Sequence, residues 1–136
     1  AGERHLAQLR ENYETANVQA HCTAFIDDMA GAYAWADLVI CRSGALTVAE
    51  LAATGVASVL VPFPHVVDDH QTLNAKFLSD AGAAILLPQQ QLTPEAISLL
   101  RQYTLPQLRE MAEKARELAR PQATADVARM CEEIAK

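Results

Sequence analysis

The chain has 136 residues, which is enough for one domain with a buried core. Hydrophobic residues make up 51% of it and charged residues 21%, a composition that excludes intrinsic disorder. The net charge of -6 argues against a nucleic-acid surface, which needs clustered Lys and Arg, and no apolar run approaches the roughly 20 residues that a membrane span requires.

Hydrophobic periodicity and turn residues predict helices that alternate with short strands. Helices are expected over 1–13, 29–35, 45–54 and 70–81, and strands over 18–25, 38–41, 58–62 and 84–87. Gly55 is expected to be the C-terminal cap of the helix over 45–54. The strands are uniformly apolar, which is typical of a parallel sheet with helices on both faces. After Pro88 only helices are expected, one from 93–94, an amphipathic one over 105–118 and one from 121 to the end. The predicted fold is an α/β, Rossmann-like parallel sheet with flanking helices.

Ligands of such sheets bind at the carboxyl ends of the strands, and the stretch CRSGALTVAE, residues 41–50, lies at one of these ends. Thr47 and Glu50 have the spacing of a capping box, in which Glu50 folds back to a backbone amide and has no ligand. In the alternative, the free amides after Gly44 and the cation of Arg42 favour an anion. Glu50, one turn later, then suits a neutral diol. Together these preferences describe a nucleotide, and both interpretations stay open.

A second polar loop, PHVVDDHQTLNA, covers residues 64–75. His65, Asp68, Asp69 and His70 are potential metal ligands, but their spacing fits no standard zinc pattern. Asp68 or Asp69 could instead cap the following helix. A third interpretation is that His70 and Gln71 bind a polyhydroxylated ligand, because an amide both donates and accepts.

The stretch FIDDM, residues 25–29, also has two interpretations. In the first, Phe25 and Ile26 are core residues that precede a helix cap formed by Asp27-Asp28. In the second, Phe25 forms an apolar wall and the Ile26 backbone bonds the edge of a planar base. In the following helix, Tyr33 and Trp35 are predicted to pack in the core.

The three cysteines are odd in number and widely spaced, and no pair has the CxxC pattern. Cys22, Cys41 and Cys131 are therefore predicted to be free thiols in a reducing compartment, with no zinc or redox site. A G-x-S-x-G nucleophile motif is also missing around Ser43, which argues against a hydrolase.

Two long stretches carry a resemblance to a known family. SGALTVAELAATGVASVLVPFPHVVDDHQTLNA, residues 43–75, resembles the donor-binding signature of two-domain, GT-B type glycosyltransferases that use UDP-sugars. FIDDMAGAYAWADLVICRSGALTVAEL, residues 25–51, is similar to the family of UDP-N-acetylglucosamine:N-acetylmuramyl-(pentapeptide) pyrophosphoryl-undecaprenol N-acetylglucosamine transferases of bacterial peptidoglycan synthesis. The similarity runs from about Gly2 to the last predicted helix.

The resemblance implies roles for the base-binding and sugar-binding positions. The backbone of Ile26 holds the uracil edge, with Phe25 and Met29 beside it. The GlcNAc hydroxyls are bound by His70 and Gln71.

The remaining implied roles fall in residues 41–50. The amides of Gly44, Ala45 and Leu46 face the diphosphate or the sugar, and Thr47 supports that loop. Glu50 accepts both ribose hydroxyls. Arg42 also matches the family's pattern, without an assigned partner.

The same resemblance implies an activity. These enzymes transfer GlcNAc from UDP-GlcNAc to the muramyl 4-hydroxyl of lipid I, with inversion, and so make lipid II. They act mainly by positioning and by stabilising the UDP leaving group, so no metal or other cofactor is required, and the sequence does not imply a divalent cation. They lie on the cytoplasmic face of the bacterial inner membrane as peripheral proteins.

The catalytic base is expected in an N-terminal acceptor domain that this chain lacks. Residues 1–136 are then a partial donor domain, with 89–136 as its C-terminal helices, and without the first strand and glycine-rich loop. No catalytic residue and no transferase activity are expected of the fragment itself. Lipid I and the membrane are expected to contact the missing domain, and self-association through an exposed sheet edge is a hypothesis.

Two positions depart from the family's pattern. Gly55-Val56-Ala57 stands where the family often has a proline, and His70 stands where it often has glutamine. Two alternatives stay open, namely another UDP-sugar enzyme of this fold, such as a UDP-GlcNAc 2-epimerase or a glycolipid glycosyltransferase, and a non-catalytic α/β module that binds a nucleotide or a partner.

Overall fold

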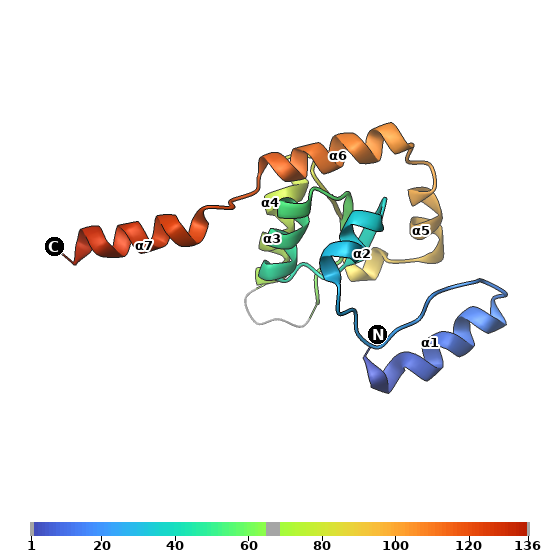
Figure 1. Cartoon of the computed structure of the whole chain (residues 1–136). Coiled ribbons are helices and arrows are strands. Elements are labelled where there is room, and N and C mark those ends of the chain that lie inside the picture. Colours follow the sequence, from blue (N-terminus) through green and yellow to red (C-terminus); the bar gives the residue numbers. More distant parts are fainter. Residues whose placement is uncertain (1, 65–68, 136) are drawn as a thin grey trace. The chain divides into compact units, whose positions relative to one another are not determined.

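The computed structural model describes residues 2–64 and 69–135, which form two compact units, residues 1–32 and 33–136. In the first unit, helix α1 (Glu3–Thr15) confirms the predicted N-terminal helix, and none of its residues is buried. It is coloured blue in Figure 1. The unit is held mainly by backbone hydrogen bonds, among them Gly2 N–H to the Ala24 carbonyl at 3.1 Å and Val18 N–H to the Tyr13 carbonyl at 2.9 Å.

The strand predicted over 18–25 was wrong, because this segment has an irregular conformation. A strand needs the hydrogen-bond ladder of a neighbouring strand, and the three strands that the structure describes pair only with one another. The apolar pattern of 18–25 therefore could not show whether a neighbouring strand is present to form hydrogen bonds with it.

Helix α2 (Met29–Trp35) begins as predicted, with an acidic cap. The Asp28 carboxylate accepts the Gly31 N–H at 2.8 Å, and a Cβ on Gly31 would lie only 2.2 Å from that carboxylate. The prediction that both aromatic residues of this helix are buried was wrong for one of them. Tyr33 is 7% exposed but Trp35 is 88% exposed. The two residues are two positions apart in the helix, which places their side chains about 200° apart around its axis, so they lie on opposite faces.

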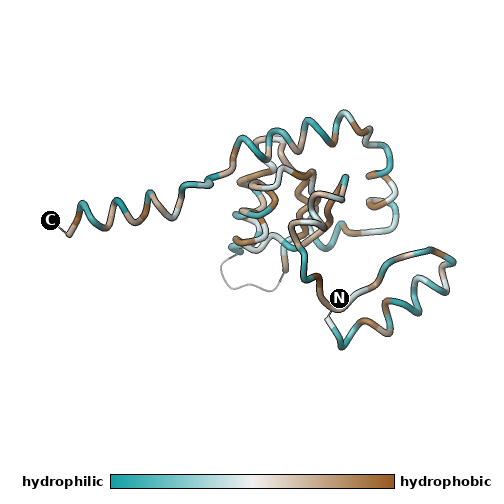
Figure 2. The backbone as a smooth tube through the Cα atoms, viewed as in Figure 1, coloured by the Kyte–Doolittle hydropathy of each residue, from teal (hydrophilic) through white to brown (hydrophobic). Residues whose placement is uncertain are grey.

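A parallel three-stranded sheet forms the centre of the second unit, as predicted. Its order is β1 (Val39–Cys41), β2 (Ser58–Leu60), β3 (Ile85–Leu86), and each strand is shorter than its predicted range. Every residue of the central strand β2 is buried, as is typical of a central strand in a parallel sheet. Figure 2 shows that the hydrophobic colouring gathers on the strands and on the helices that cover them.

Helices α3 (Ala45–Thr54) and α4 (His70–Ser79) connect the strands, so all three strands have their carboxyl ends on one edge of the sheet. Helix α3 packs against α4 and against α6 (Leu105–Glu117) (Figure 1). A 3-10 turn η1 (Gln89–Gln91), helix α5 (Pro94–Leu100) and helix α7 (Ala123–Ile134) complete the unit. The fully buried Leu51, Leu60 and Leu78 bring α3, β2 and α4 into one core.

Helix α3 ends at Gly55, as predicted, and Gly55 has a left-handed φ of 63°. A Cβ there would lie 2.7 Å from Arg116 Nε and 3.2 Å from the Ala112 carbonyl oxygen. Gly82 has a similar φ of 68°, but its added Cβ would meet only Lys114, at 3.5 Å and 3.8 Å.

We expect Gly82→Ala to lower the free energy of unfolding by about 1 kcal/mol, which is the cost of a left-handed alanine. Gly55→Ala should lower it by roughly 1 kcal/mol more, because the new methyl group also displaces α6. Urea unfolding of the two variants measures the difference. An equal loss of unfolding free energy in the two variants would show that Arg116 can move away from the new methyl group at no energetic cost.

Candidate functional site

The start of helix α3 has no side-chain cap. Strand β1 leads through residues 42–44 to Ala45, and the N-cap residue Gly44 has an extended conformation, with φ −62° and ψ 149°. The first intrahelical bond runs from Val48 N–H to the Gly44 carbonyl, at 3.0 Å. The amides of residues 45–47 therefore have no acceptor within the helix, and they point out of its N-terminus. This arrangement, with the positive end of the helix dipole, suits an anion.

The capping-box interpretation of Thr47 and Glu50 was wrong. Helix α3 begins at Ala45, so Thr47 is its third residue and Glu50 its sixth, and no side chain caps the helix. A capping box needs its Thr or Ser before the first helical residue. A capping box at Thr47 would start the helix after Thr47. The helix instead starts at Ala45, because the chain already changes from the strand to the helix at the N-cap residue Gly44.

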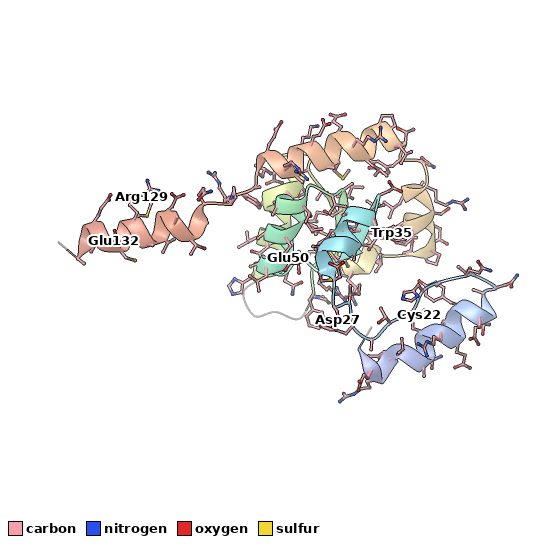
Figure 3. All side chains as sticks on the ribbon, viewed as in Figure 1. Cys22, Asp27, Trp35, Glu50, Arg129 and Glu132 are labelled. Atoms are coloured by element: carbon pink, nitrogen blue, oxygen red, sulfur yellow. The ribbon has the colours of Figure 1, made fainter. Side chains whose placement is uncertain are left out.

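Glu50 lies on the exposed side of α3, where Figure 3 labels it. One carboxylate oxygen, Oε2, accepts a hydrogen bond from the Tyr33 hydroxyl at 3.0 Å. The side chains of an α-helix lean towards its N-terminus, so the Glu50 side chain leans towards the end of α3 that carries the free amides. The site thus combines an anion-binding helix end with a hydrogen-bond acceptor on Glu50, whose backbone lies about 7.5 Å further along the axis than that of Ala45, from five residues at 1.5 Å each.

Arg42 has its partners within the protein. One guanidinium nitrogen, Nη1, donates to the carbonyls of Val61 and Pro62 at 3.2 Å and 3.1 Å, and Nη2 donates to Gln89 Oε1 at 2.6 Å. The guanidinium carbon also lies 5.2 Å from the centre of the Phe63 ring. Arg42 therefore ties the end of β1 to the chain after β2 and to η1, and a direct contact between Arg42 and a ligand stays a prediction.

Two hydrogen bonds join the starts of α3 and α4. The fully buried Ser43 donates from Oγ to the Gln71 carbonyl at 2.7 Å, and Asn74 Nδ2 donates to the Ser43 carbonyl at 3.1 Å. Gln71 Oε1 in turn accepts Phe63 N–H at 2.9 Å. This fixes the side-chain amide of Gln71 so that its NH₂ group is the end left to bind a ligand.

The rest of the 64–75 loop is described only in part. His65 and Asp68 lie outside the described residues, so the structure does not test a metal or a cap that uses them. Asp69 occupies the N-cap position of α4 with φ 47°, but its side chain makes no capping hydrogen bond. His70 is the first residue of α4 and is exposed.

Phe25, Ile26 and Met29 belong to the first unit and are described on their own. Their exposed fractions are 74%, 42% and 37%, so the interpretation of Phe25 and Ile26 as core residues was wrong. The backbone N–H and carbonyl of Ile26 make no hydrogen bond to any described residue. That backbone is consequently available to a planar base, as the alternative interpretation requires.

A cavity of about 660 Å³ lies between α3, α4 and the segment that follows α6. It shares Ala45, Leu46 and Glu50 with the predicted site, whereas Thr47, His70 and Gln71 are not in its lining. Its walls are mostly apolar, with Leu73 and Phe77 among them, and such walls do not suit a diphosphate. The cavity is therefore a poor environment for the anionic part of a ligand, in contrast to the amides at the start of α3.

Cys41 is the last residue of β1, next to Arg42 in the chain, and all three cysteines are unpaired. Burial raises the pKa of the Cys41 thiol to about 11, so the thiol is protonated at neutral pH. A protonated thiol is a poor nucleophile, and Cys41 therefore acts as a packed side chain.

Sequence reasoning missed three residues that shape the site, namely Tyr33, Ser43 and Asn74. A signal existed for Tyr33, because a buried tyrosine needs a partner for its hydroxyl and Glu50 is the only acidic residue of the apolar helix 45–54. No comparable signal identified the partners of Ser43 and Asn74, because they lie 31 residues apart along the chain.

Comparison with known proteins identifies the family. The family described as "Glycosyltransferase family 28 C-terminal domain" matches residues 1–132. Two relatives named "UDP-N-acetylglucosamine--N-acetylmuramyl-(pentapeptide) pyrophosphoryl-undecaprenol N-acetylglucosamine transferase" are similar over the whole chain. The protein of Dechloromonas aromatica (strain RCB) is 68% identical over 136 residues, and that of Bordetella petrii is 58% identical over 137 residues.

A solved structure, titled "Crystal structure of acinetobacter baumannii MurG", has the same fold. Its TM-score is 0.90 at 46% identity, over 98% of this chain and 40% of that chain. The chain spans 39% and 38% of the two relatives, or about two-fifths of their length. None of the described helices is both long and apolar enough to cross a bilayer. With its parallel sheet, its flanking helices and a match over residues 1–132, the chain belongs to glycosyltransferase family 28, as a C-terminal domain of the GT-B type.

Proposed function

We propose that this chain is the donor-binding domain of an inverting transferase that moves GlcNAc from UDP-GlcNAc to N-acetylmuramyl-(pentapeptide) pyrophosphoryl-undecaprenol, converting lipid I to lipid II. The names of the relatives at 68% and 58% identity support the donor and the acceptor. The structural observation that carries the proposal is the uncapped start of α3 with a carboxylate further along the same helix. An anion site and a diol acceptor at this spacing match the diphosphate and ribose of a nucleotide.

The diphosphate and ribose are assigned to helix α3. The amides that follow Gly44, on Ala45, Leu46 and Thr47, bind the diphosphate or the adjoining sugar, because they lack an intrahelical acceptor. Glu50 accepts hydrogen bonds from the two ribose hydroxyls, for which a charged acceptor is stronger than a neutral one.

The uracil and the sugar are assigned to two other segments. The backbone of Ile26, which makes no hydrogen bond to a described residue, binds the base edge beside the exposed side chains of Phe25 and Met29. His70 and the fixed amide of Gln71 bind the GlcNAc hydroxyls at the start of α4.

On this proposal the chain contributes positioning and charge stabilisation to the reaction. The helix amides stabilise the negative charge that develops on the UDP leaving group, so no metal or other cofactor is assigned. The acceptor, the catalytic base and the membrane contact are assigned to the part of the relatives that this chain does not match, and the location to the cytoplasmic face of the inner membrane. The chain alone is expected to be inactive.

Complementation tests the proposal. The full-length transferase that contains this chain should restore growth to a bacterial strain depleted of its own lipid I-specific GlcNAc transferase. Cell extracts should then form lipid II from lipid I and UDP-GlcNAc. A well-expressed protein that neither restores growth nor forms lipid II would contradict the proposed activity, even if it binds UDP.

A further inference from the structure

The hydrogen bond between Tyr33 and Glu50 connects the core to the candidate site. Tyr33 is 7% exposed and belongs to the same buried cluster as Val48 and Leu51, while its hydroxyl reaches the exposed carboxylate of Glu50 at 3.0 Å. The two residues come from different helices, 17 positions apart. No other hydrogen bond to this carboxylate is present among the described residues, so the tyrosine alone anchors it.

An exposed glutamate is a flexible ligand unless something holds it. Fixing such a side chain costs about 1.5–2 kcal/mol of rotamer entropy, which is otherwise lost when the ligand binds. Two neighbouring ribose hydroxyls need both carboxylate oxygens at a defined angle, whereas a freely rotating carboxylate samples many angles. A buried ring has few conformations of its own, so its hydroxyl is a fixed reference point for Glu50.

We propose that Tyr33 is a positioning residue for ribose recognition, holding Glu50 through Oε2 in the orientation that accepts the ribose hydroxyls before the ligand arrives. This rests on the proposed function, because it deepens the role assigned there to Glu50. Each carboxylate oxygen has two acceptor sites, so Oε2 can bond both Tyr33 and one ribose hydroxyl while Oε1 accepts from the other.

The protonation state of Tyr33 agrees with a donor role. Burial, and then the hydrogen bond to Glu50, raise the pKa of the Tyr33 hydroxyl to about 12. The hydroxyl therefore keeps its proton over the whole physiological range and donates to the carboxylate at any pH at which the protein works.

The test compares two nucleotides in the full-length transferase by calorimetry. UDP carries both ribose hydroxyls and 2′,3′-dideoxy-UDP carries neither. Tyr33→Phe keeps the buried ring and removes only the hydroxyl, so it should weaken UDP binding about fivefold to tenfold and leave dideoxy-UDP binding unchanged. Tyr103→Phe is the matched control, since Tyr103 is 38% exposed and its hydroxyl has no hydrogen bond among the described residues, and it should change neither affinity.

The outcomes separate this inference from the proposed function. Unchanged UDP binding in Tyr33→Phe, or equal losses for both nucleotides, would overturn the positioning role. If the wild-type protein binds no UDP, the proposed function itself fails. If Glu50→Ala loses equal affinity for both nucleotides, the ribose role of Glu50 fails, and the positioning role of Tyr33 fails with it.

A measurement on the unliganded wild-type protein does not depend on how the variant folds. NMR relaxation of the Glu50 side chain should show it to be more ordered than that of Glu113, an exposed glutamate of α6 with no hydrogen bond among the described residues. Equal disorder of the two side chains would refute the positioning role directly.

Discussion

Replacing Glu50 with alanine is expected to weaken UDP binding by about 1.5–3 kcal/mol, the range for hydrogen bonds to a charged group. This corresponds to roughly a 10- to 150-fold rise in the dissociation constant. The reason is that two ribose hydroxyls lose their common acceptor, while the amides at the start of α3 still bind the diphosphate. Isothermal titration calorimetry on the full-length transferase measures the change.

Two further variants make this result interpretable. Glu50→Gln keeps an oxygen that accepts from Tyr33, so it should retain the wild-type melting temperature and still lose UDP affinity, because a neutral amide is the weaker acceptor. Glu113→Ala removes an exposed glutamate from α6 and should leave UDP binding as it is. UDP affinity that survives in Glu50→Ala would show that the ribose is bound elsewhere, and that Glu50 serves only as the partner of Tyr33.

The second large effect is expected on stability. Arg42→Ala should lower the free energy of unfolding by about 1.5–3 kcal/mol, because the carbonyls of Val61 and Pro62 lose a charged donor and Gln89 loses its partner. Arg42→Lys should recover only a small part of this loss, since an ammonium group cannot reach three acceptors as the planar guanidinium does. Urea unfolding measures both variants.

A matched arginine and a ligand measurement complete this test. Arg101 is exposed just after α5, and its side chain makes no hydrogen bond or ion pair to the described residues, so Arg101→Ala should change stability by less than about 0.5 kcal/mol. The structural role of Arg42 would be contradicted if Arg42→Ala kept the wild-type free energy of unfolding but bound UDP more weakly. That result would make Arg42 a ligand contact, as its place in the family's pattern implies.

Local signals predicted those parts of the fold that depend on neighbouring residues. The bounds of α2 and α3, the αL glycine at Gly55 and the acidic cap at Asp28 all follow from residues within one or two turns. The parallel sheet followed from the uniformly apolar strands and the alternation with helices. The family followed from long stretches of matching positions, of which residues 25–51 are the most specific.

The errors lie where contacts distant in sequence decide the outcome. Residues 18–25 have a strand-like composition, but a strand exists only with a paired neighbour. The capping box at Thr47 and Glu50 satisfied a spacing rule, although the helix begins at Ala45. The partners of Arg42 lie 19, 20 and 47 residues away in the chain, where no local pattern could identify them.

The most direct test of the account is a crystal structure of the full-length transferase with UDP-GlcNAc bound. We expect both ribose hydroxyls to lie within hydrogen-bond distance of the Glu50 carboxylate, with the Tyr33 hydroxyl still bonded to Oε2, and the phosphate oxygens to face the amides of residues 45–47. A nucleotide whose ribose lies away from Glu50, or whose phosphates are held by Arg42 and not by the start of α3, would contradict this expectation.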